Sequence, residues 1–209
     1  MKTQSSFNWT LLVLAALLLP ACSIKDITQT LNNIKSLQYK LGAVDNYKLA
    51  GVRLDDKRQI SDFNAFDALK LTRAFTSGEL PATFTLNLLA HNPNDGKEGR
   101  TSTPVTLSAI DFRLYIDDKQ TIQGDLAAPV TIPGGGQTQT IPIQMTVDLA
   151  KFFGDKSYED VARLALALGG VEGSAARLTL DIKPTVETSI LGKVTYPGRI
   201  KVVDKEFRQ

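Results

Sequence analysis

The feature that most constrains the fold of this chain is a regular alternation of apolar and polar residues. Over residues 141–149 every second position is Ile, Met, Val or Leu, and Pro, Gln, Thr and Asp stand between them. Successive side chains of a β-strand point to opposite faces, so this alternation predicts strands with one face in a core and one in water. Similar patterns predict strands at residues 47–54, 83–90, 110–117 and 178–183, a first strand that begins at 37–41, and further strand residues at Val194, Ile200 and Val202.

Turn signals separate these stretches. Asn94-Asp95-Gly96, Asp117-Asp118-Lys119 and Pro133-Gly134-Gly135-Gly136 each carry residues that favour tight turns. The glycine run precedes a predicted strand and not a helix, so an inter-strand turn is favoured over a phosphate-binding loop. About seven short strands joined in this way predict a mainly β fold, an antiparallel β-sandwich.

Two segments are predicted to be helical. Apolar residues at close to helical spacing follow Ser61-Asp62, which predicts a helix at about 62–75 as an insertion between strands. A second helix is predicted to begin at Ser157 and to end at Gly169-Gly170. The first helix is expected to cover one sheet. The alternative is that it forms one wall of an apolar groove that binds a lipid. The candidate groove residues are Phe63, Phe66, Leu69 and Phe75.

The N-terminus is typical of a bacterial lipoprotein signal. Residues 11–19 are an unbroken run of Leu, Val and Ala, about half of what a membrane-spanning helix needs. Leu19-Pro20-Ala21-Cys22 follows, which resembles a lipobox, and Cys22 is the only cysteine of the 209 residues. The sequence therefore predicts a signal peptide at 1–21, acylation at Cys22, a lipidated tether at 22–36 and one sandwich domain at 37–209. Within 22–36, Ile24, Ile27, Leu31 and Ile34 allow an amphipathic helical turn or two as an alternative to a polar tether.

Candidate groups for chemistry are scarce. The chain has one His and one Cys, so neither a structural zinc site nor a disulfide is expected, and no cofactor is predicted. His91 stands at a strand end without catalytic partners in any motif, so a local hydrogen-bonding role is favoured over catalysis. The formal net charge of +2 comes from dispersed Lys and Arg, which argues against nucleic acid as a partner. No catalytic residue and no metal ligand is predicted.

The order of several short motifs carries a family resemblance. Asn92-Pro93-Asn94 closes one strand, and residues 112–117 form the next. Gly124-Asp125-Leu126, the Pro-Gly turn at 133–136 and the Ile141-Pro142-Ile143 strand then follow. This order resembles the type 2 late embryogenesis abundant (LEA) family, also called the WHy domain, over roughly 47–203. The helix at 62–75 and the lipid anchor depart from the pattern of that family.

The resemblance implies an immunoglobulin-like or fibronectin-III-like sandwich that is not an enzyme. Members of the family are associated with protection of proteins or membranes during water stress. The expectation is therefore a protective or scaffold and binding module of the cell envelope, with the membrane, client proteins or lipids as partners. The alternative is a carrier for a lipid or another apolar ligand. Ser23, and not Asp, follows Cys22, which points to the outer membrane facing the periplasm if the organism has two membranes.

Overall fold

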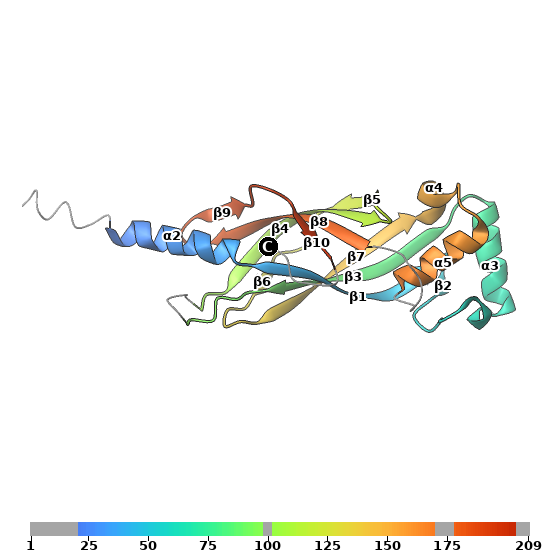
Figure 1. Cartoon of the computed structure of the whole chain (residues 1–209), viewed down its shortest axis with the longest axis horizontal. Helices are drawn as coiled ribbons and strands as arrows, with labels where there is room; N and C mark the ends of the chain where they lie inside the picture. The colour runs from blue at the N-terminus through green and yellow to red at the C-terminus, as the bar shows by residue number, and fades with distance from the viewer. Residues whose placement is uncertain (1–20, 98–101, 170–177, 204–209) are drawn as a thin grey trace, which may run out of the picture.

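The computed structural model describes residues 21–97, 102–169 and 178–203. Its strands form two antiparallel sheets (Figure 1). The first sheet has the order β2-β1-β3-β7, and the second has the order β10-β8-β4-β5, with β6 paired to β4 and β9 paired to β8. The strands are β1 (Gln38–Leu49), β2 (Val52–Arg53), β3 (Pro81–His91), β4 (Val105–Ile116), β5 (Lys119–Gly124), β6 (Val130–Ile132), β7 (Thr138–Asp148), β8 (Leu178–Thr188), β9 (Gly192–Thr195) and β10 (Ile200–Val202).

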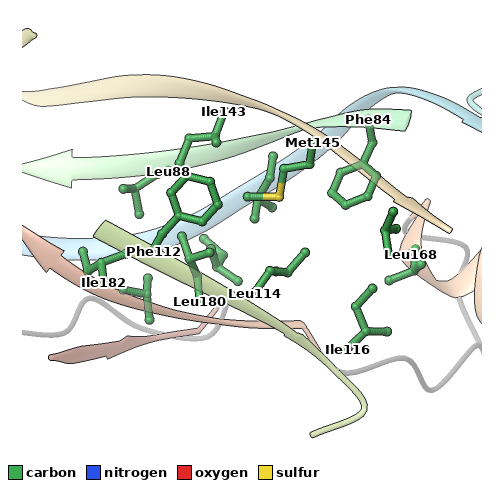
Figure 2. Packing of buried hydrophobic residues seen from close by; sticks show 14 of the residues in the cluster. Phe84, Leu88, Phe112, Leu114, Ile116, Ile143, Met145, Leu168, Leu180 and Ile182 are labelled. Atoms are coloured by element: carbon green, nitrogen blue, oxygen red, sulfur yellow. The ribbon is translucent and has the colours of Figure 1, made fainter. Parts of the chain in front are cut away.

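The core lies between the two sheets, as the alternation predicts. Phe84 and Leu88 of β3 and Ile143 and Met145 of β7 face Phe112 and other apolar side chains of the opposite sheet (Figure 2). Along β7 buried and exposed residues alternate from Thr140 to Val147. Leu41 N also donates a hydrogen bond of 3.0 Å to Val203 O, which joins the two sheets at one edge. The structure confirms a mainly β, antiparallel sandwich.

One predicted strand is wrong in its extent. Residues 47–54 do not form a single strand, because the chain turns at Ala50-Gly51 between β1 and β2. Both turn residues have positive φ, 47° at Ala50 and 77° at Gly51, which is the backbone of a tight two-residue hairpin. Glycine adopts this conformation without the steric cost of a side chain.

The described residues form more helices than the two that the sequence predicts. They are α2 (Ala21–Lys35), a 3₁₀ turn η1 (Ile60–Asp62), α3 (Ala65–Thr76), α4 (Leu149–Phe153) and α5 (Tyr158–Leu168). Ser157 caps α5 as predicted: its side chain accepts a hydrogen bond from Asp160 N. The short α4 was not predicted; Asp148 caps it and also accepts a 2.8 Å hydrogen bond from Leu80 N.

The first predicted helix starts later than expected. Its cap is Asn64 and not Ser61-Asp62, because the Asn64 side chain bonds to Asp67 N while the Asp67 side chain bonds back to Asn64 N. The Asp62 carboxylate instead accepts hydrogen bonds from Arg58 N and Gln59 N. Figure 1 places α2 at one end of the long axis of the molecule and α3 at the other.

Candidate functional site

The Asn92-Pro93-Asn94 motif lies at the end of β3, and both of its asparagines are buried. Asn92 is 0% and Asn94 is 1% exposed. The Asn92 amide donates to Thr103 O at 3.0 Å, and its Oδ1 accepts from Asn94 N and Asn94 Nδ2. Asn92 N donates to Gln137 O at 2.9 Å, just before β7. The predicted turn is therefore also a buried polar connection between three segments.

Asn94 extends this connection to α2. Its Nδ2 donates to Asn33 O at 3.1 Å, and its Oδ1 accepts from Ser36 Oγ at 3.2 Å. Asn94 O accepts from Gly135 N at 2.9 Å, in the glycine turn. We call Asn92, Asn94 and Ser36 the asparagine cluster. It fixes the C-terminal end of α2 to the ends of strands from both sheets.

Two tyrosines lie on the same end of α2. The Tyr196 hydroxyl donates to Ile34 O, and burial raises the pKa of Tyr196 to about 12. The Tyr39 side chain is fully buried, and that burial raises its pKa well above the ordinary value near 10. Burial disfavours the charged phenolate, so both tyrosines remain neutral near pH 7. Ile34 near the end of α2 and Leu37 just after it are both buried in the core.

The glycine run joins the two sheets beside the cluster. It connects β6, which belongs to the second sheet, with β7, which belongs to the first. Gly135 and Gly136 have φ of 80° and 73°, and a Cβ on Gly134 would lie 2.9 Å from the backbone carbon of Ser102. Only glycine fits this turn, and the turn has a structural role as predicted.

A cleft of about 350 Å³ lies between α2 and the sandwich. Ile34, Val105 and Ile190 give it apolar surface, and Glu187 is its one charged side chain. The rest of the lining is uncharged: Gln29, Thr30, Asn33, Thr103, Pro104, Thr106, Thr188 and Ser189. This volume falls within the range of small-molecule sites. Sequence reasoning missed the cleft, because its three walls come from segments far apart in the chain and none carries a motif.

The four candidate groove residues do not meet in one groove. Phe63 and Phe75 are half-buried against the core, and the Phe75 ring packs edge-on against Tyr158 at 5.3 Å. Phe66 is 78% and Leu69 is 48% exposed. The cavity that Phe75 helps to line has a volume of about 10 Å³, enough for a single water molecule.

The remaining candidate residues are His91 and Cys22. His91 Nδ1 lies 3.1 Å from Thr138 Oγ1 of β7, which is a local hydrogen bond. Within the described ranges no three His, Cys, Asp or Glu side chains gather into a metal-binding group. Cys22 is the second residue of α2, and the signal peptide assigned to 1–21 lies outside the described residues except for Ala21. In the described part of the chain, no helix has the length and apolar character to cross a membrane.

Comparison with solved structures gives matches of low identity and low TM-score. No family model and no curated protein matches the chain. A candidate LEA protein is 15% identical, with 92% of this chain and 84% of that chain covered and a TM-score of 0.38. A protein from Arabidopsis thaliana is 18% identical (60% and 73% covered, TM-score 0.36), and one from Archaeoglobus fulgidus is 14% identical (59% and 87% covered, TM-score 0.31).

Proposed function

We propose that this chain is a non-enzymatic lipoprotein of the cell envelope, anchored through acylated Cys22 and presenting a LEA type 2-like sandwich as a protective or scaffold and binding module. The observation that carries the proposal is the placement of α2. The helix begins at the candidate acylation site, and its other end is held by hydrogen bonds from the buried Asn94 and the half-buried Tyr196. A helix fixed in this way holds the sandwich at a set position relative to the anchor.

The apolar residues of α2 support the anchoring role. Leu31 is half-buried and Ile34 is buried at the sandwich, whereas Ile27 is 37% and Ile24 is 63% exposed. Ile24 and Ile27 stand two and five residues after Cys22, close to the point where acyl chains would enter the membrane. Apolar side chains at this position would lie in the interface and add to the affinity of the acyl chains.

The anchoring is tested by membrane fractionation of the host. When these membranes are partitioned with detergent, the wild-type chain is expected in the detergent phase. The Cys22→Ala chain is expected in the aqueous phase, with a different electrophoretic mobility. Ser23→Ala is the matched control, because it alters the neighbouring residue and leaves the thiol in place. A Cys22→Ala chain that stays in the detergent phase with unchanged mobility would contradict acylation.

The protective form of the module is tested separately. The purified chain is expected to slow heat-induced or freeze-induced aggregation of a bystander enzyme at substoichiometric amounts. An inert albumin is the control for a general protein effect. An outcome equal to that control would exclude the protective role and leave the scaffold role as the proposal.

The alternative function is a carrier for a lipid or another apolar ligand, and the 350 Å³ cleft beside α2 favours it. Ile34, Val105 and Ile190 offer apolar contact there, and the uncharged polar residues suit an ester or a hydroxyl group. Native mass spectrometry of the chain extracted from membranes is expected to show a lipid adduct. Val105→Asp would place a charge on the buried wall of the cleft and abolish the lipid adduct. If the wild-type chain itself shows no lipid adduct, the carrier function is excluded.

A further inference from the structure

The outward face of α3 combines exposed apolar and cationic residues. Phe66, Leu69, Lys70 and Arg73 are all exposed. With 3.6 residues per turn, these four positions fall within an arc of about 100° on the helix. Leu71 is the buried residue of α3 and lies on the other side. We call this set the α3 outer face.

The local structure holds the α3 outer face in place although the helix buries little. The reciprocal cap of Asn64 and Asp67 fixes the first turn. Lys57 lies 3.4 Å from the Asp67 carboxylate and 5.7 Å from the centre of the Phe63 ring. Phe66 is 78% exposed, and other residues make the contacts that anchor α3. Packing in the core therefore does not explain why a phenylalanine stands at this position.

The charges beside the apolar pair indicate which partner fits. Within the described part of the chain, neither Lys70 nor Arg73 has an ion pair with a carboxylate. At a lipid interface, apolar side chains such as Phe66 and Leu69 can insert among the lipids while neighbouring Lys70 and Arg73 are attracted to anionic headgroups. An acidic protein surface would satisfy the cations, but a lipid surface also accepts two isolated apolar side chains without a preformed pocket.

We propose that the α3 outer face docks on an anionic lipid surface. This surface is a second one, which faces the membrane that holds the acylated Cys22. The position of α3 in the molecule supports a second surface, since α2 and α3 lie at opposite ends of the long axis (Figure 1). The 15 residues of α2 span about 20 Å and the 12 residues of β1 about 40 Å, which separates α3 from Cys22. The opposed geometry rests on the proposed acylation, whereas the lipid affinity of α3 does not.

The experiment uses two vesicle populations. The processed chain is anchored through Cys22 in neutral phosphatidylcholine donor vesicles, and labelled acceptor vesicles contain phosphatidylcholine alone or with phosphatidylglycerol. Recruitment of acceptors to donors is measured by energy transfer. Acceptors with phosphatidylglycerol are expected to be recruited, neutral acceptors are not, and added salt is expected to reduce recruitment.

Two double variants test the residues. Phe66→Ser with Leu69→Ser is expected to reduce recruitment about tenfold or more, from lost apolar insertion. Lys70→Gln with Arg73→Gln is expected to reduce it about tenfold, from lost attraction to the headgroups. The controls are Ala127→Ser with Ala128→Ser, two exposed apolar residues between β5 and β6, and Lys193→Gln with Lys201→Gln, two exposed cations of β9 and β10. Melting temperatures should be unchanged in all variants, because the replaced side chains are exposed.

Several outcomes would overturn the proposal. Lipid docking by α3 would be excluded if acceptor vesicles are not recruited at any phosphatidylglycerol content. It would also be excluded if recruitment falls equally in the test and control variants. A photo-crosslinker at Phe66 that captures a second copy of the chain while acceptors are ignored would assign the face to self-association. If the chain washes off the donor vesicles, the acylation fails instead, and binding of the free chain and its α3 variants to acceptors then tests the face directly.

Discussion

Every polar group of Asn94 has a partner inside the molecule, although the residue is 1% exposed. Its amide nitrogen donates to Asn33 O and Asn92 Oδ1, and its oxygen accepts from Ser36. A buried group that loses such a partner carries its full desolvation cost. The sequence predicts the turn at this motif but not the cluster, because Ser36 and Asn33 stand 58 and 61 residues away from Asn94.

Removal of the Asn94 side chain is therefore expected to destabilise the fold. Asn94→Ala should lower the free energy of unfolding by about 2–4 kcal/mol, since it removes the buried hydrogen bonds of the Asn94 side chain to Asn33 O, Asn92 Oδ1 and Ser36 Oγ and opens a small void. Urea unfolding followed by circular dichroism measures the change. Asn32→Ala, at an exposed position of α2, is the control and should change stability by less than about 0.5 kcal/mol. Equal effects of the two variants would contradict the role of the cluster.

The buried tyrosines predict a loss of stability at alkaline pH. Burial raises the pKa of Tyr196 to about 12, and raises those of Tyr39 and Tyr47 above their ordinary value. In the unfolded chain these groups ionise near pH 10. The stabilisation is therefore complete below pH 10 and is lost as the pH rises from 10 through 12.

Absorbance at alkaline pH measures this effect. Phenolate absorbance from the buried Tyr39 and Tyr47 and the half-buried Tyr196 is expected to appear together with unfolding and not before it. Tyr196→Phe should be less stable at neutral pH, because Ile34 O loses one of its two donors and keeps only Leu37 N, and should lose less stability per pH unit above 10. Phenolate absorbance of all tyrosines near pH 10 in the folded chain would contradict the burial.

Among the elements, α3 and α5 differ in how well the sequence predicts them. Ser157 is followed by apolar residues at helical spacing and a closing Gly169, and α5 has these bounds. Before α3 there are several residues that can cap a helix, and only the reciprocal bond with Asp67 selects Asn64. The hairpin at Ala50-Gly51 was missed for a related reason, since one glycine in an apolar stretch does not distinguish a strand from a turn. Caps depend on side-chain bonds and turns on local backbone conformation, and periodicity records neither.

The stability of α3 is expected to depend on its cap. The helix buries one residue, Leu71, so tertiary packing contributes little. Asn64→Ala should cost about 1 kcal/mol and raise the hydrogen-exchange rates of the α3 amides. Thr72→Ala, at an exposed position of α3, is the control and should leave exchange unchanged or slower. Unchanged exchange in Asn64→Ala would show that packing, and not the cap, holds the helix.

At the scale of the whole molecule, the alternation of apolar residues predicts the sandwich because it determines which face of each strand is buried. It does not predict which strands pair, since β1 pairs with β3 and β4 with β8 across long stretches of sequence. For the same reason, the cleft beside α2 could not be predicted: its walls come from α2, β4 and the β8–β9 turn. The two ends of the molecule are formed by different helices: α2, whose second residue is Cys22, lies at one end and α3 lies at the other (Figure 1).

The central claim is that α2 links an acylated Cys22 to the sandwich. The intact mass of the chain extracted from host membranes tests it most directly. Acylation predicts a chain that begins at Cys22, with the mass of the residues 22–209 increased by a diacylglyceryl group, alone or together with one N-acyl chain. An N-terminus at any other residue, or an unmodified Cys22 in the membrane-extracted chain, would contradict it.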